Sequence, residues 1–158
     1  MSGFYSAGLF DVIPDSVTSR PDDDESESSF SESQGLAIVS SKSFSGTKAR
    51  ISSQTSGVTR ARVYDYGQSE YIASTDISGL SSGDVFQIDF DFQSGVDYGI
   101  ELDAEGGDYT AGFNRDERDY PYTGTDIDII ARSRNGTQID DGTSSSGVSS
   151  VNDIGNPQ

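Results

Sequence analysis

The sequence predicts an all-β protein: a single antiparallel β-sandwich or jelly-roll-like domain that follows an extended N-terminal arm. Three observations support this. Apolar and polar residues alternate at a period of two, Gly- or Ser-rich breaks recur at intervals of roughly ten residues, and helical periodicity is absent. With 158 residues, of which 32% are hydrophobic, the chain can bury one modest core.

Three parts are expected along the chain. Residues 1–34 read as an arm or linker, because an apolar opening is followed by prolines, an acidic run and serines. Residues 35–140 form the sandwich, and residues 141–158 form a Ser/Gly-rich C-terminal tail. The apolar residues of the arm would be an unusual exposed patch on so acidic a protein, so we expect them to dock on a neighbouring subunit. They are Phe4, Tyr5, Leu9, Phe10, Val12 and Ile13.

The clearest strand is expected at residues 85–92. There the apolar residues Phe86, Ile88, Phe90 and Phe92 alternate with Gln87, Asp89 and Asp91, which places four large groups on one face. Further strands are expected at residues 36–40, 47–53, 59–65, 71–76, 109–113 and 125–132.

The segment that follows residue 96 repeats the alternation. Tyr98, Ile100 and Leu102 are expected to face the core, with Asp97, Glu101 and Asp103 facing solvent. The intervening loop of residues 93–95 contains a glycine and suggests a hairpin between the two strands.

The charge of the chain indicates an environment of concentrated salt. Its net charge is −17, with twenty Asp residues and Lys only at Lys42 and Lys48. In molar salt the screening length falls to about 3 Å, so such a surface becomes tolerable. We therefore expect a halophilic protein. Nucleic-acid binding is disfavoured, because phosphate contacts need clustered Arg and Lys.

Enzymatic activity is not expected. The chain has no cysteine and no histidine, which removes thiolate and imidazole chemistry. The carboxylate pairs Asp126/Asp128 and Asp89/Asp91 resemble glycosidase pairs, but they read better as solvent-facing acids that discourage edge pairing. No secretory signal and no apolar run of about 20 residues is found, so neither secretion nor a membrane span is expected.

Acidic residues gather around Gly106 and Gly107. Asp103, Glu105 and Asp108 could supply hard oxygen ligands for calcium, although the spacing is not that of an EF-hand loop. The alternative is a solvated acidic turn. No other cofactor is expected.

The loop at residues 113–122 combines two of the few arginines with aromatic rings. Arg115, Arg118, Tyr120 and Tyr122 could contact sugars or a protein neighbour, or the rings could cap one end of the sandwich. Together with Phe4, Tyr5 and Phe10, they are the expected contact residues. The segment Asn135-Gly136-Thr137 fits an N-glycosylation acceptor and is equally a good turn.

Several segments resemble β-sandwich domains encoded by haloarchaeal tailed viruses and related proviruses. They are spread over residues 46–122, and are Gly46 to Arg50, Ala61 to Asp65, Ile77 to Asp84, Tyr98 to Gly107 and Tyr120 to Tyr122. The resemblance implies a carbohydrate-binding or lectin-like sandwich in a particle-surface or tail-fibre-like protein.

The resulting expectation is a structural component of a haloarchaeal virus particle, as a capsid decoration, a turret or a tail-fibre-like protein. It would be assembled in the host cytoplasm, lie on the virion surface and form a homo-oligomer through its arm. Other virion proteins and host glycans are its expected partners. The alternative is a non-catalytic carbohydrate-binding module of a halophilic archaeon.

Overall fold

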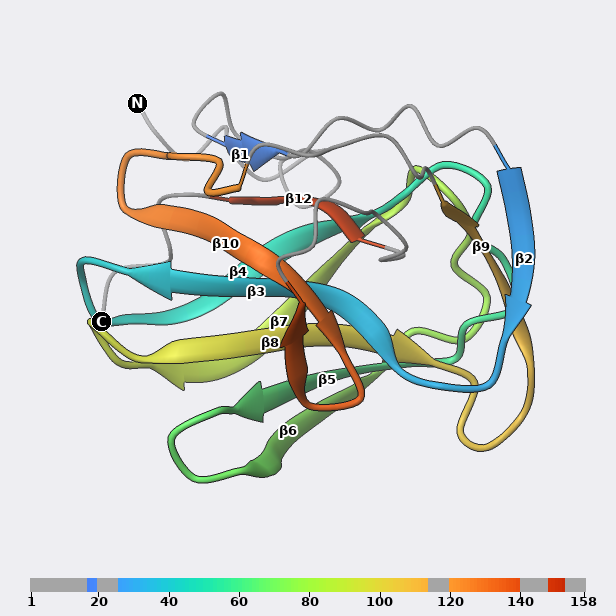
Figure 1. Ribbon diagram of the computed structural model, residues 1–158, viewed down its shortest axis with the longest axis horizontal. Helices are drawn as coiled ribbons and strands as arrows, with labels where there is room; N and C mark the ends of the chain where they lie inside the picture. The colour runs from blue at the N-terminus through green and yellow to red at the C-terminus, as the bar shows by residue number, and fades with distance from the viewer. Residues whose placement is uncertain (1–16, 20–25, 114–119, 140–147, 153–158) are drawn as a thin grey trace, which may run out of the picture.

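The computed structural model is all-β, as the sequence predicts. It describes residues 17–19, 26–113, 120–139 and 148–152, with side chains for residues 29–111, 120–139 and Val148. Within these residues every strand pairing is antiparallel. Two sheets lie face to face and form a sandwich, with a separate pair of strands at one end (Figure 1).

The larger sheet has six strands in the order β11-β10-β3-β8-β5-β6. Strands from distant parts of the sequence therefore form one layer, in which β8 lies between β3 and β5. The strands are β3 (Gln34–Ser40), β5 (Arg60–Asp65), β6 (Glu70–Asp76), β8 (Asp97–Asp103), β10 (Ile127–Arg134) and β11 (Thr137–Ile139).

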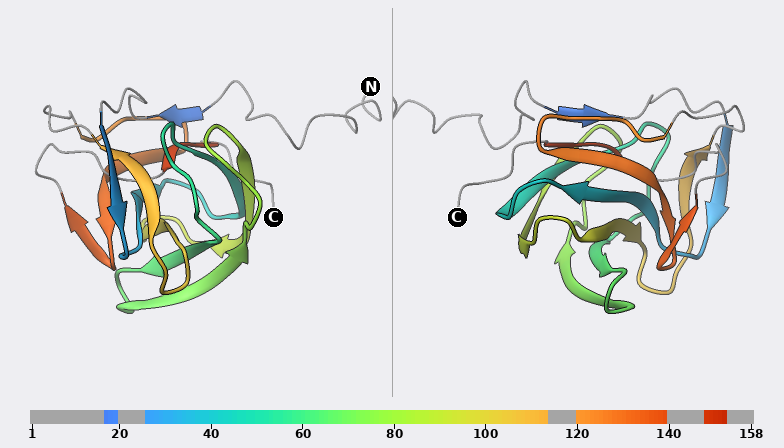
Figure 2. Two further views of the ribbon diagram at one scale, coloured as in Figure 1. Left: turned by 90° about the vertical axis from the view of Figure 1, so that its right-hand side faces the viewer. Right: turned by 60° about the vertical axis from the view of Figure 1, so that its left-hand side comes forward.

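The smaller sheet has four strands in the order β1-β12-β4-β7, and β2 pairs with β9 apart from both sheets. The β2–β9 pair stands at one end of the sandwich and crosses its strand direction (Figure 2). These strands are β1 (Val17–Ser19), β2 (Ser26–Phe30), β4 (Phe44–Ile51), β7 (Val85–Phe92), β9 (Tyr109–Phe113) and β12 (Val148–Asn152).

Regular strands extend beyond the expected boundaries at residues 35 and 140. β1 and β2 belong to the segment read as an arm, and β12 belongs to the segment read as a tail. Val148 of β12 is fully buried, so this strand contributes to the core.

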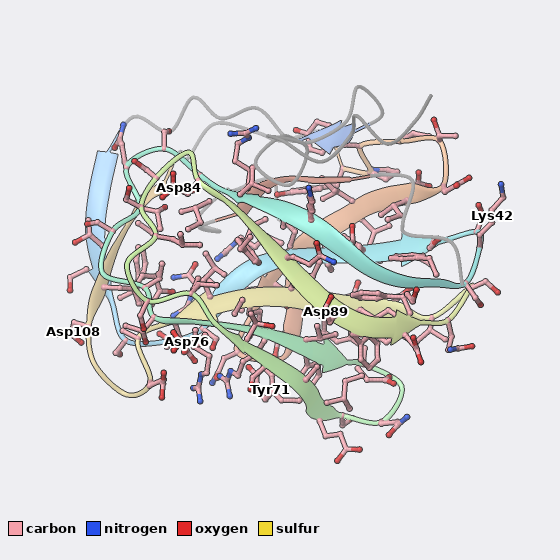
Figure 3. The ribbon with its side chains drawn as sticks, turned by 180° about the vertical axis from the view of Figure 1, so that it is seen from behind. Lys42, Tyr71, Asp76, Asp84, Asp89 and Asp108 are labelled. Atoms are coloured by element: carbon pink, nitrogen blue, oxygen red, sulfur yellow. The ribbon has the colours of Figure 1, made fainter. Side chains whose placement is uncertain are left out.

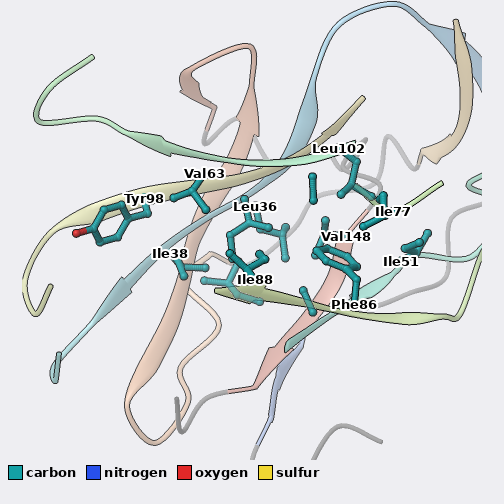
Figure 4. Close-up of a cluster of buried hydrophobic side chains, with 14 of the residues drawn as sticks. Leu36, Ile38, Ile51, Val63, Ile77, Phe86, Ile88, Tyr98, Leu102 and Val148 are labelled. Carbon is teal, nitrogen blue, oxygen red and sulfur yellow. The ribbon is translucent and has the colours of Figure 1, made fainter. Parts of the chain in front are cut away.

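The core fills the space between the two sheets (Figure 4). On β7 the expected alternation is confirmed: Phe86, Ile88 and Phe92 are buried, while Asp89 and Asp91 are exposed. The buried side chains of this strand face the larger sheet, whose β8 contributes Ile100 and Leu102 from the other side. Burial of these side chains supplies the main driving force for the fold.

Phe90 is only half-buried, and the strand register gives the reason. Ser45 pairs with Asp91 and Thr47 pairs with Ile88, so between these pairs one residue of β4 opposes two of β7. This β-bulge re-aims the side chain at the sheet edge. The Phe90 ring still packs edge-on against Phe92, with centroids 4.9 Å apart.

The hairpin expected at residues 93–95 is wrong. β7 lies in the smaller sheet and β8 in the larger one, so this loop carries the chain from one layer to the other. The amide of Gly95 donates to the carbonyl of Ser40 at 2.8 Å, which ties the loop to the end of β3. Two strands that face one core from opposite layers have the same alternation as two strands of a hairpin.

The expected exposure of Glu101 and Asp103 is also wrong. Glu101 is 0% exposed and Asp103 is 4% exposed, although Ile100 and Leu102 between them point into the core. Both carboxylates therefore lie on the outer face of the larger sheet, where β8 is central and other side chains cover it.

Candidate functional site

Glu101 is the centre of a polar cluster on the outer face of the larger sheet. One carboxylate oxygen, Oε1, accepts a hydrogen bond from the Tyr71 hydroxyl at 2.7 Å. The other, Oε2, accepts from the Ser133 hydroxyl at 2.5 Å and from the Gly136 amide at 3.0 Å. Donors from β6, β10 and the β10–β11 turn therefore meet on one buried acid of β8, which satisfies its acceptors away from water.

The β10–β11 turn is shaped for this contact. Asn135 and Gly136 have φ values of 50° and 77°, as the tight turn of a two-residue hairpin requires. A Cβ atom added at Gly136 would lie 2.7 Å from the Tyr64 ring, so only glycine fits there without displacement. The turn expected at these residues is confirmed, and glycosylation of the exposed Asn135 stays a prediction.

Three tyrosines pack together above β5 and β8. The Tyr64 ring meets Tyr66 and Tyr71 edge-on, with centroids 5.2 Å and 4.8 Å apart. The Tyr66 hydroxyl shares a hydrogen bond with Ser133. Burial raises the pKa of Tyr66 and of Tyr71 well above the usual value, and for Tyr71 the hydrogen bond and the charge of Glu101 add to the effect.

Asp103 carries the second buried carboxylate. Arg60 donates to it through Nε at 2.9 Å and Nη2 at 2.8 Å, Arg62 approaches at 2.9 Å, and the Ser33 hydroxyl donates at 2.7 Å. The guanidinium of Arg62 also lies 3.6 Å from the centroid of the Tyr71 ring. Burial tends to raise the pKa of Asp103, but hydrogen bonds from Arg60 and Ser33 and the charge of Arg62 outweigh it and lower that pKa.

We call this set of side chains the buried carboxylate network. It comprises Glu101, Asp103, Arg60, Arg62, Tyr71, Ser33 and Ser133. The network joins β5, β6, β8 and β10 across the outer face, together with Ser33, which directly precedes β3. Its two arginines and Tyr71 are partly exposed.

Sequence reasoning missed the arginines of this network and the tyrosines that pack beside them. The alternation over residues 60–66 could have indicated them. There the outward residues are Arg60, Arg62, Tyr64 and Tyr66, in contrast to the aspartates of β7. Long amphipathic side chains of this kind can cover a neighbouring strand, whereas aspartate cannot.

The structure does not bring the expected calcium ligands together. Asp103 is engaged by Arg60 and Arg62, while Glu105 and Asp108 are exposed. Over the described part of the chain, no group of three or more acidic side chains is placed to hold a metal ion.

Two of the expected contact residues, Tyr120 and Tyr122, are described, and both are half-buried against the core. Their rings meet edge-on at 5.3 Å, and Tyr122 exchanges backbone hydrogen bonds with Ile129 at 2.8 and 3.0 Å. This arrangement fits the alternative in which the rings cap the sandwich. The other expected contact residues lie outside the described residues: Phe4, Tyr5, Phe10, Arg115 and Arg118.

The two aspartate pairs line separate open grooves. Asp89 and Asp91 flank a groove of about 450 Å³ at the β7 bulge, and Asp126 and Asp128 flank one of about 390 Å³ beside the end of β3. Each pair comes from one stretch of chain, so neither groove has carboxylates facing each other from opposite walls.

Fold and outer face together define this protein as an antiparallel β-sandwich with a polar network on one layer. No protein-family model, curated protein or solved structure matches the chain. The described residues contain no helix that is long and apolar enough to cross a membrane.

Proposed function

We propose that this chain is a non-enzymatic structural protein of a haloarchaeal virus particle, displayed on the capsid or tail surface and assembled in the host cytoplasm. The observation that carries the proposal is the separation of charges in the sandwich. The ion pairs of Asp103 are largely buried in the network, whereas aspartates such as Asp76, Asp89 and Asp108 are exposed.

The buried pairs keep their strength in concentrated salt. The side chain of Asp103 is 6% exposed, and those of Arg60 and Arg62 are 29% and 19% exposed. Mobile ions screen buried pairs much less than exposed ones. The Asp103 contacts therefore continue to join β5 to β8 at salt concentrations that cancel surface attractions.

The exposed carboxylates have the opposite property. Asp76, Asp89 and Asp108 project from different parts of the surface (Figure 3). Two surface cations are already paired, since Lys42 lies 3.6 Å from Asp126 and Arg134 binds Glu32 at 2.7 Å. At low salt the remaining carboxylates repel one another, and in molar salt the screening length of about 3 Å removes this cost.

The step from a halophilic sandwich to a virus particle rests on the resemblance of its segments and on the apolar N-terminal arm. The root of that arm is tied to the sandwich by two contacts. Glu32 accepts two hydrogen bonds from Arg134, and Ser33 donates to Asp103. A docked arm would thus hold the sandwich firmly on a neighbouring subunit, consistent with a homo-oligomer that contacts other virion proteins.

The experiment is to band particles from lysed cultures that express this gene in a density gradient in molar salt. Antibodies against the sandwich then locate the chain. We expect it to band with the particles, and recovery only at the top of the gradient contradicts the proposal. Genes for portal, major capsid or tail proteins beside its own would be independent support.

A carbohydrate-binding module of a halophilic archaeon is the second candidate function. The groove beside Asp126 and Asp128 favours it, because hydroxyl and carboxylate side chains line that groove. The two functions are compatible, since a particle-surface protein can bind host glycans.

A further inference from the structure

The open groove beside the end of β3 has a lining suited to polyhydroxylated ligands. Its volume is about 390 Å³, which lies within the range of small-molecule sites. We call it the Asp128 groove. The lining side chains that carry the argument are Ser41, Thr123, Asp126 and Asp128. The hydroxyl of Ser40, which also lines the groove, already donates to the carbonyl of Lys42 and accepts from its amide.

We propose that the Asp128 groove binds a neutral pyranose sugar. Adjacent hydroxyls of a pyranose can donate two hydrogen bonds to one carboxylate, and short Ser and Thr hydroxyls can both donate to and accept from the ring substituents. Hydrogen bonds that involve an ionised acceptor are about twice as strong as neutral ones. Asp128 is therefore the principal ligand-binding residue of this site.

One oxygen atom of the Asp128 carboxylate already accepts a hydrogen bond that holds the wall of the groove. Its Oδ1 atom accepts the amide of Gly124 at 3.0 Å, which holds the loop that precedes β10. The Gly124 contact uses Oδ1 and not Oδ2. A sugar diol can thus bind to Asp128 without breaking the contact that positions it.

The walls of the Asp128 groove are fixed before a ligand arrives. The amide of Ser41 donates to the carbonyl of Asp126 at 2.9 Å, and Tyr122 is bridged to Ile129 in both directions. The site therefore requires little ordering on binding, which favours affinity for a small ligand.

Charge decides the ligand class. The described lining holds two carboxylates and no Lys or Arg, and one of the two, Asp126, forms an ion pair with Lys42 at 3.6 Å. The whole chain carries a net charge of −17. A uronic acid or a sulfated sugar would bring a further negative charge beside Asp126 and Asp128, so the groove discriminates in favour of neutral sugars.

This inference rests on the second candidate function and is independent of the particle proposal. A failure to bind sugar leaves the gradient experiment unaffected, and a failure to band with particles leaves sugar binding unaffected. The two can therefore fail separately.

The test is saturation-transfer NMR and titration of the full chain in molar KCl with methyl glucoside, methyl galactoside and methyl mannoside. Glucuronic acid is the matched anionic probe. We expect at least one neutral glycoside to bind and glucuronic acid to bind at least ten-fold more weakly. The proposal is overturned if no neutral glycoside binds, or if glucuronic acid binds equally well.

Variants locate the binding to the groove. Asp128→Asn retains the shape of the side chain but removes the second acceptor oxygen, and we expect about ten-fold weaker binding. The control variant, Asp108→Asn, makes the same charge change at the end of the molecule opposite to Lys42 (Figure 3). It should bind the glycoside as tightly as the parent protein does. Equal binding by both variants overturns the proposal. If Asp128→Asn fails to fold by circular dichroism, Thr123→Val is used, and the same loss is required of it.

Discussion

The guanidinium of Arg60 donates two parallel hydrogen bonds to the carboxylate of Asp103, at 2.9 and 2.8 Å, and so links β5 to β8 on the outer face of the sheet. Such bidentate, charge-assisted hydrogen bonds are roughly twice as strong as neutral ones. Arg62 approaches the same carboxylate, so removal of Asp103 would leave two guanidinium groups partly buried without it.

Asp103→Asn should therefore be strongly destabilising. Because it leaves two partly buried cations uncompensated, we expect a loss of about 3 kcal/mol or more in the free energy of unfolding. Urea denaturation in molar KCl measures it, with Asp108→Asn as the exposed control that should change stability little. A loss equal to that of the control would mean that the network contributes nothing beyond surface charge.

Salt should govern folding. We expect the folded structure to be lost below roughly physiological ionic strength, where the screening length is about 8 Å or longer, and to be stable in molar salt. Circular dichroism melts across a KCl series measure this. A melting temperature that does not change with KCl would contradict the halophilic interpretation.

The buried tyrosines should make the protein sensitive to alkali. Burial raises the pKa of Tyr66, Tyr71 and Tyr109 in the folded state. The neutral form is therefore favoured by folding. Its contribution to stability is complete below the ordinary tyrosine pKa of about 10 and is lost as the pH rises toward the folded-state values.

Ultraviolet absorbance of tyrosinate, recorded with circular dichroism over the same pH range, follows that loss. We expect part of the tyrosinate signal to appear only together with unfolding. If all eight tyrosines ionise near pH 10 while the fold persists, the burial of these three is wrong.

Core packing on β7 provides a matched comparison. Phe92 is 1% exposed, and its replacement by Ala should cost about 3–5 kcal/mol. Phe90 is half-buried at the bulge, so Phe90→Ala should cost less. Urea denaturation of both variants measures the two losses in the free energy of unfolding. A larger loss for Phe90→Ala than for Phe92→Ala would contradict the position of Phe90 at the bulge.

The N-terminal arm should be needed for assembly but not for folding. We expect deletion of residues 1–16, which precede β1, to leave a folded sandwich that no longer forms oligomers or enters particles. Light scattering after size-exclusion chromatography in molar salt measures the oligomer. Assembly equal to that of the full chain, or unfolding of the shortened chain, would contradict the docking role.

Much of the fold could be predicted from local sequence. The alternation over residues 85–92 located β7 and its buried face, and the Gly- and Ser-rich breaks separated the other strands near their observed positions. Side-chain direction alternates along any strand, so a run of a few residues is enough to reveal it. The acid excess of the surface could be read from composition alone.

The larger sheet and its network could not be predicted in this way. The strands on either side of β8 come from residues 34–40 and 60–65. The residues that cover Glu101 and donate hydrogen bonds to it include Tyr71 and Gly136. Alternation of acidic and apolar residues along a strand predicts that the acidic side chains are exposed only if no other side chains cover their face of the sheet. Whether it is covered depends on residues some 30 positions away along the chain, because long-range packing and not local periodicity decides which faces are removed from water.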